Sequence, residues 1–149
     1  MFLQIALGSA VLVVNVLVMA VAALVLEIVF RAIHPWLLKP PQRLKLVLML
    51  VAVGVWVLLV LTLNIWIWAY VLFETGVFKS LEESLYYAIE AFSTLGLGDV
   101  VPKPDWRIFA AMAAVNGLLS FGLLTALLVE ALRQVRLSQL EEREKDAGD

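Results

Sequence analysis

The sequence predicts an all-α integral membrane protein with three transmembrane helices and a short re-entrant helix and loop between helices 2 and 3. Three observations predict this fold. The 149-residue chain is 63% hydrophobic with a mean hydropathy of +0.97, whereas soluble domains are about half apolar. Three apolar stretches each exceed the roughly 20 residues that a helix needs to cross the hydrocarbon core. A polar, glycine-containing segment separates the second stretch from the third.

The apolar runs and the charges between them divide the chain into four parts. An additional N-terminal transmembrane helix is expected over 3–33, a linker over 34–43, a membrane unit over 44–132 and a tail over 133–149. Within the membrane unit we expect an outer helix over 44–73, a short helix over 81–92, a loop over 94–99 and an inner helix over 107–132.

The short helix has its own start signal. Ser80 followed three residues later by Glu83 forms a capping box. A helix over 81–92 is about 18 Å long, too short for a core of about 30 Å. The chain must therefore turn back through Gly96 and Gly98 to reach the third span, which makes this a re-entrant segment. Such backbone is tolerated at membrane depth only beside protein or a water-filled cavity.

The loop "TLGLGD", residues 94–99, has the composition of a cation site built from backbone. Glycine adopts positive φ without steric cost, and alternating glycines let successive carbonyls point to one side. Carbonyls aligned in this way replace the water shell of a cation. The C-terminal dipole of the short helix and the carboxylate of Asp99 would also attract positive charge. The alternative is a structured extracellular loop with ordinary turn glycines.

This loop resembles the T-V-G-Y-G-D selectivity filter of potassium channels. The resemblance extends to "LYYAIEAFSTLGLGD", which is similar to the pore helix and filter of the simple bacterial tetrameric channels, and to "GLLSFGLLT", residues 117–125, which is similar to their inner helix. Residues 3–33 have no counterpart in the two-helix channels. The resemblance implies a homotetramer around a central pore, with a pore domain over 44–132.

The resemblance also implies an ion-binding role for the loop. Potassium ions would be held by the carbonyls of four residues, with the hydroxyl of Thr94 at the innermost site and Gly98 at the outer mouth. The ion-binding residues are Thr94, Leu95, Gly96, Leu97 and, at the mouth, Gly98. No organic cofactor is expected.

The filter would be supported from the short helix. The resemblance implies that Glu90 and Asp99 pair behind the filter and share a proton, since two close carboxylates resist double ionisation. Tyr86 and Tyr87 correspond to the aromatic pair of the bacterial pore helix.

The inner helix would carry the gate. The resemblance implies a gating hinge at Gly117 and a water-filled cavity below the filter. The residues assigned to this hinge and cavity are Gly117, Leu118, Phe121, Gly122 and Thr125. Spacing alone places Leu118, Phe121 and Thr125 on one helix face.

Leu97 departs from the family pattern, which has tyrosine or phenylalanine at that position. Leucine keeps the carbonyl and loses the ring that normally packs around the filter. The favoured function is a passive potassium-selective channel, gated at the inner helix or the filter. Two alternatives stay open: a weakly selective cation channel, and a non-conducting membrane scaffold or accessory subunit. No serine–histidine or paired-aspartate arrangement suggests an enzyme.

Basic residues indicate the orientation. The first connection, residues 31–45, carries four lysines or arginines and no acid, and the tail opens with Arg133 and Arg136. Both are therefore expected to be cytoplasmic, with the N-terminus and the loop outside. Trp66, Trp68 and Tyr70 suit an outer aromatic belt. The expected partners are other copies of the chain, membrane lipids and monovalent cations, without nucleic acid. A bacterial plasma membrane is the expected location.

Three further features concern polar residues in the spans. Glu27 and Arg31 lie four apart and are predicted to pair near one end of the first span. Asn15 is expected to bond to a neighbouring helix. Asn116 fits either the cavity or a neighbouring helix. The absence of cysteine excludes disulfides and thiolate metal sites.

Overall fold

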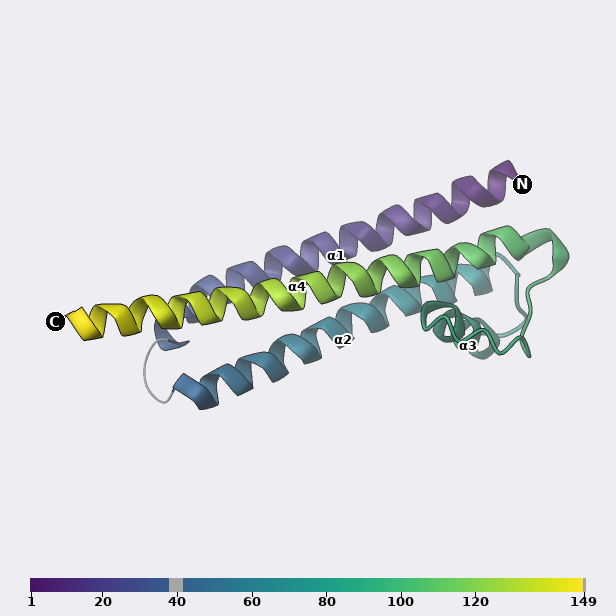
Figure 1. Cartoon of the computed structure of the whole chain (residues 1–149). Coiled ribbons are helices and arrows are strands. Elements are labelled where there is room, and N and C mark those ends of the chain that lie inside the picture. The colour runs from purple at the N-terminus through teal and green to yellow at the C-terminus, as the bar shows by residue number, and fades with distance from the viewer. Residues whose placement is uncertain (38–41, 149) are drawn as a thin grey trace.

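The computed structural model describes the backbone of residues 1–37 and 42–148 and the side chains of residues 1–33, 44–134, 136 and 137. The elements in chain order are α1 (Phe2–Leu37), α2 (Gln42–Glu74), α3 (Leu81–Phe92), the 3-10 helix η1 (Pro104–Trp106) and α4 (Arg107–Gly148). Figure 1 shows three long helices side by side, with α3 tucked against one end of the bundle.

Three segments are long and apolar enough to cross a membrane, namely Phe2–Ile33, Leu44–Glu74 and Pro104–Gln134. The three-span prediction is therefore confirmed. The short helix lies between the second and third spans and has the bounds expected from the sequence, Leu81–Phe92.

Two connections differ from expectation. The linker expected over 34–43 is shorter, because α1 continues to Leu37 and α2 begins at Gln42; residues 38–41 lie outside the described residues. The inner helix does not end at residue 132 but continues into the tail as far as Gly148. The tail contains good helix formers such as leucine, glutamate and arginine and has no glycine or proline before Gly148.

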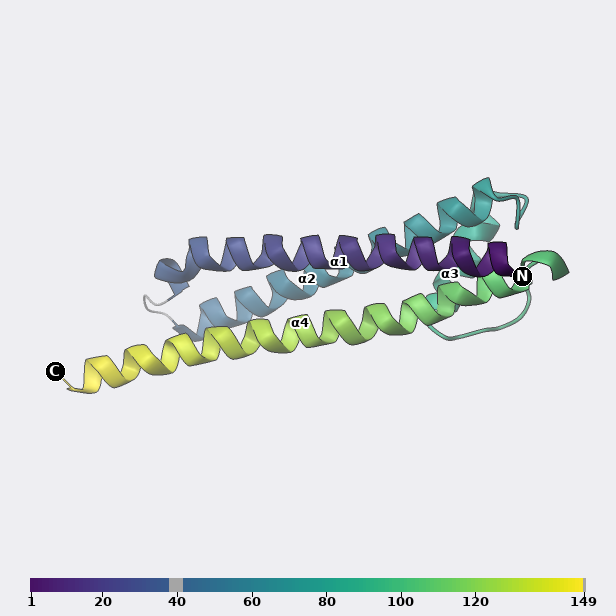
Figure 2. The ribbon, with the colours of Figure 1, turned by 90° about the horizontal axis from the view of Figure 1, so that it is seen from above.

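The three long helices do not all run in the same direction. α1 and α4 run in the same direction and α2 runs in the opposite one (Figure 1). α1 contacts both α2 and α4, and α3 contacts α2 and α4. The N-terminus lies at the end of the bundle that carries α3, which we call the loop end, and the C-terminus lies at the opposite, tail end (Figure 2).

A side chain of α1 joins it to α4 at the loop end. The side-chain amide of Gln4 donates to the carbonyl of Asp105, and its Oε1 accepts from the backbone N–H of Phe109 at 3.4 Å. The first N–H groups of a helix have no partner within that helix. Gln4 therefore supplies a capping acceptor to α4 and fixes the position of α1 along it.

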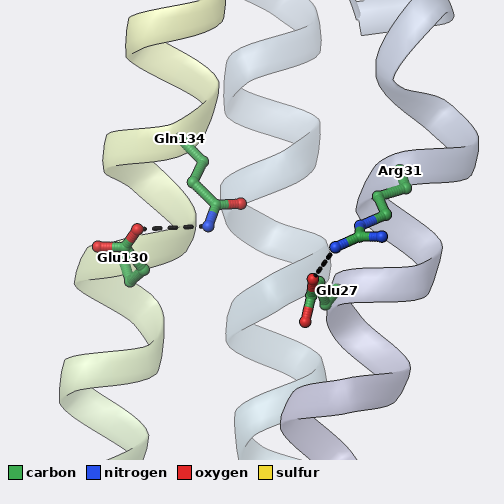
Figure 3. Close-up of polar contacts among 4 residues, drawn as sticks. All are labelled: Glu27, Arg31, Glu130 and Gln134. Atoms are coloured by element: carbon green, nitrogen blue, oxygen red, sulfur yellow. Dashed lines mark hydrogen bonds and ion pairs between the residues drawn. The ribbon is translucent and has the colours of Figure 1, made fainter.

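The tail end of the bundle carries charged and amide side chains (Figure 3). Arg31 donates to Glu27, so the predicted pair is confirmed. Gln134 donates to Glu130 at 3.3 Å, and Arg133 lies 3.6 Å from the same carboxylate. These contacts lie within α1 or within α4. Because the side chains are largely exposed, the ion pairs contribute at most about 1 kcal/mol each.

The main core lies at the loop end and joins α2, α3 and α4, with Val11 of α1 packed against them. Trp68 and Phe109 are wholly buried there, with ring centroids 5.5 Å apart. The prediction that Trp68 belongs to a lipid-facing belt is therefore wrong: its ring faces α4. Trp66 and Tyr70 are 44% and 58% exposed, because they lie on the other side of α2.

Candidate functional site

The start of α3 is fixed by the capping residues that the sequence indicated. Ser80 has extended backbone, and its Oγ accepts from the N–H of Glu83 at 3.1 Å. The Glu83 carboxylate accepts from the N–H of Lys79 at 3.1 Å, one residue before the cap. Both bonds hold the chain as it enters α3 and so set the direction of this helix.

α3 presents a buried face to α2 and α4. Ser84 and Ala88 are completely buried, and Phe92 is 1% exposed. The rings of Phe78 and Tyr87 lie 4.9 Å apart and close the side near the preceding loop. α3 is therefore anchored along its length, which gives the following segment a rigid support.

Residues 94–99 return along α3 in the opposite direction. The N–H of Leu97 donates to Oε1 of Glu90 at 3.1 Å, and the hydroxyl of Tyr86 donates to Oδ2 of Asp99 at 3.0 Å. Tyr86 and Glu90 are one helical turn apart on α3, so the two bonds hold the returning segment at two successive levels.

The backbone of the loop has a regular alternation. φ is positive at Thr94 (56°), Gly96 (58°) and Gly98 (78°), while Leu95 and Leu97 keep negative φ. Successive residues of opposite handedness collect their N–H groups on one side of the chain. Here that side faces α3: Thr94 N–H donates to the carbonyl of Ala91 at 3.1 Å and Leu95 N–H to that of Glu90 at 3.0 Å.

The carbonyls of the same residues are unengaged. Within the described part of the chain, no hydrogen bond reaches the carbonyl oxygens of residues 94–98. Residues 93–99 are all exposed in a single chain. The loop thus combines N–H groups bound to α3 with carbonyl oxygens that accept no hydrogen bond within the described residues, a combination suited to a cation and unsuited to an anion.

The two carboxylates have separate partners. Glu90 is 5% exposed and accepts from Leu97, while Asp99 is exposed and accepts from Tyr86 and from the N–H of Val100. Within the described residues, no hydrogen bond joins Glu90 to Asp99, so the pairing that the resemblance implied is absent from the single chain.

Both tyrosines of α3 are affected by these carboxylates. The hydrogen bond to Asp99, followed by desolvation and the charges of Asp99 and Glu90, raises the pKa of Tyr86 above its usual value of 10.0. Burial, followed by the charge of Glu90, raises the pKa of Tyr87. In each case these causes favour the neutral phenol over the phenolate.

We expect Tyr86→Phe to alter stability at high pH. Because the pKa of Tyr86 is raised on folding, its contribution is present below the unfolded value of about 10 and is lost as pH rises through the folded pKa. The variant should have a slightly lower thermal midpoint at pH 7 and a smaller loss of stability above pH 10. The measurement is the thermal midpoint of the reconstituted protein from pH 7 to 11. Tyr70→Phe, at an exposed position of α2, serves as the control, and identical pH profiles for Tyr86→Phe and wild type would contradict the assignment.

We expect Glu90→Ala to loosen the loop. The substitution leaves the N–H of Leu97 without its acceptor, and a hydrogen bond to a charged group contributes about 1.5–3 kcal/mol. Glu90→Gln keeps an acceptor oxygen without the charge and should lose less. Hydrogen exchange at the Leu97 amide measures the effect directly. Exchange should rise in the order wild type, Gln, Ala, whereas equal exchange in all three would show that this bond does not hold the loop.

Gly117 lies against the end of α3. A Cβ at this position would lie 2.5 Å from the Cα of Phe92 and 2.8 Å from its carbonyl oxygen. The glycine is therefore required for close contact between α4 and the residue two positions before the loop. α4 is continuous through Gly117; its hinge role stays a prediction.

The other residues assigned to the inner helix are exposed in the single chain. Leu118 is 68% and Phe121 45% exposed, and Gly122 and Thr125 are exposed as well. Asn116 is wholly buried, which decides between its two interpretations: it faces its neighbours within the chain. The described part of the chain therefore leaves this stripe of α4 uncovered.

Sequence reasoning missed the contact between Phe92 and Gly117 and the buried Asn64 of α2. The first carried no clear signal, because Gly117 lies about 100° around the helix from both Asn116 and Leu118 and about 40° from Phe121. The second carried no signal beyond a single amide in an apolar run.

Comparison with known proteins agrees with this geometry. A family model described as "Ion channel" matches residues 56–134, just over half of the chain. The matched region includes most of α2, the whole of α3 and the loop, and the membrane-spanning part of α4. The chain belongs to this ion channel family. Neither the comparison with curated proteins nor that with solved structures gave a match.

Proposed function

We propose that this chain forms a homotetrameric, potassium-selective channel whose filter is the backbone of residues 94–98. One observation, the backbone geometry of this loop, carries the proposal. The N–H groups of Thr94, Leu95 and Leu97 are bonded to α3, the sign of φ alternates, and the carbonyls accept no hydrogen bond within the described residues. One chain supplies one set of carbonyl acceptors, whereas an ion that has lost its water shell must be surrounded by acceptors from several chains. Four chains around an axis would provide rings of carbonyls.

Conduction in such a filter is passive. Carbonyl rings at Thr94, Leu95, Gly96 and Leu97 replace the hydration shell of potassium, with the Thr94 hydroxyl at the inner end. Repulsion between ions in adjacent sites then moves them through. α3 supports this in two ways, since its C-terminal dipole favours positive charge beside the loop and its side chain Glu90 fixes the N–H of Leu97. No organic cofactor takes part.

Orientation and location belong to the same proposal. The loop and the N-terminus share one end of the bundle, and the basic residues of the tail lie at the other. By the positive-inside rule, the loop end faces outward and the tail is cytoplasmic. We place the channel in a bacterial plasma membrane with lipid and other copies of the chain as neighbours.

Leu97 favours a second candidate, a weakly selective cation channel. Its side chain is 63% exposed, and the hydroxyl of Tyr86, one of the two α3 tyrosines, is engaged by Asp99. The chain therefore gives this side chain little support, and a filter without a packed ring at this position would adjust its diameter more easily.

The experiment is cation flux from liposomes that contain the purified full-length protein, with potassium and sodium gradients compared. We expect potassium flux with little sodium flux, and Leu97→Tyr should not reduce this preference. Equal flux of both ions would establish the weakly selective channel. No flux from a protein that is folded and tetrameric, under any membrane potential or pH tried, would favour the non-conducting scaffold.

A further inference from the structure

Four polar side chains lie buried inside the helical bundle, away from the filter. Asn15 of α1, Asn64 of α2, and Asn116 and Ser120 of α4 are all 0% exposed in the single chain. They belong to segments that span the membrane. Burying a polar group in an apolar medium is costly unless it finds a hydrogen-bond partner, so four such groups together require an explanation.

Contacts between the helices place these residues at one level. The indole N–H of Trp56 donates to the carbonyl of Ala22 at 3.3 Å and sets the register of the antiparallel pair α1 and α2. Asn15 lies seven residues before Ala22, and Asn64 lies eight residues after Trp56. The two amides therefore lie on the loop-end side of this contact, at similar distances from it along their helices.

The register of α1 and α4 brings in the other two residues. The side chain of Met112 lies against Gly8, since a Cβ on Gly8 would be 2.3 Å from its sulfur. The two helices are parallel (Figure 1), so seven residues beyond Gly8, Asn15 reaches the level between Asn116 and Ser120. We call the set Asn15, Asn64, Asn116 and Ser120 the buried polar layer.

The polar atoms of this layer are almost all unpaired. The amide of Asn64 donates to the carbonyl of Val60 at 2.8 Å. Its oxygen, both polar atoms of Asn15 and Asn116, and the hydroxyl of Ser120 have no hydrogen-bond partner. The layer thus presents donors and acceptors together and carries no charge. Water matches this set, because it both donates and accepts and bonds to about three groups when buried.

We propose that the buried polar layer is a binding site for internal water, through which α1 is hydrogen-bonded to α2 and α4. Asn116 directly precedes Gly117, which contacts Phe92 at the end of α3. The layer therefore connects α1 to the support of the filter. The layer lies within one chain, so its formation does not depend on which cation the pore selects.

The test is solid-state NMR of the full-length protein, reconstituted in lipid bilayers with ¹⁵N-labelled asparagine. We expect water-to-amide cross-peaks from the side-chain amides of Asn15 and Asn116. Thr62 of α2 lies at nearby depth but does not need internal water, because its exposed hydroxyl already donates to the carbonyl of Leu58. Amides bonded directly to one another without water, or amides that show no water contact and no partner, would each overturn the proposal.

A second measurement separates the layer from ordinary packing. Asn15→Leu leaves the polar atoms of α4 without the shared water and should lower the thermal midpoint by about 3–6 °C. Asn15→Leu combined with Asn116→Leu should cost less than the sum of the two single changes, because neither partner is then left unsatisfied. Thr62→Val is the matched control and should have little effect. If the change in thermal midpoint of the double variant equalled the sum of the two single changes, the residues would not share water.

Discussion

Gly117→Ala is expected to displace the end of α3 and abolish flux. The added methyl would lie 2.5 Å from the Cα of Phe92 and 3.0 Å from its carbonyl carbon, and this neighbour is backbone that cannot rotate away. Overpacking of this kind costs about 1–3 kcal/mol in each chain. Because Phe92 precedes the loop by two residues, the displacement would reach Thr94. The measurements are the thermal midpoint and potassium flux of the reconstituted protein.

Gly54→Ala is the control for this prediction. Gly54 also lies inside a membrane-spanning helix, α2, and a Cβ there would have no atom within 4 Å. The variant should keep flux and should gain part of the helix propensity by which alanine exceeds glycine, about 1 kcal/mol. If Gly117→Ala kept the wild-type midpoint and changed only channel opening, the hinge would explain this glycine better than the contact with Phe92.

Gly96→Ala is expected to abolish potassium flux while the protein still folds. Gly96 has φ of +58° and open space around its Cα, so the cost is backbone strain and not a clash. An L-residue in the left-handed region loses about 1–2 kcal/mol, and in a tetramer four chains would be strained at one level of the filter. Relief of that strain would rotate the adjoining carbonyls away from the ions.

Gly76→Ala provides the comparison for Gly96→Ala. Gly76 has φ of +68°, also with no atom within 4 Å of a built Cβ, but it lies in the turn after α2. Both variants should show a similar loss of thermal stability, and only Gly96→Ala should lose flux. Equal loss of flux in both would mean that general destabilisation, and not the carbonyl row, accounts for the result.

The sequence was sufficient wherever local chemistry decides the structure. Apolar runs identified the three spans, and Ser80 with Glu83 gave the start of α3 to the residue. The glycines at 96 and 98 indicated positive φ, which the structure shows. The pair Glu27 and Arg31 followed from their spacing on one helix. Each of these features depends on residues within about one helical turn or on composition.

The sequence was insufficient wherever distant segments meet. Nothing in α2 showed that Trp68 points to Phe109 and away from lipid, because an aromatic residue near a span end suits either environment. Residue type alone also did not show which partners Glu90 and Asp99 take, since that depends on how the loop returns along α3. The contact between Gly117 and Phe92 likewise exists only after α3 has docked on α4.

The central claim is that the backbone of residues 94–98 forms a carbonyl filter in a fourfold assembly. The most direct test is a high-resolution structure of the protein in lipid, determined once in potassium and once in sodium. Four chains around an axis should appear, with potassium density between the carbonyls of Thr94, Leu95, Gly96 and Leu97 and the N–H of Leu97 still bound to Glu90. Carbonyls that point away from the axis, or an assembly without a shared axis at this loop, would contradict the account.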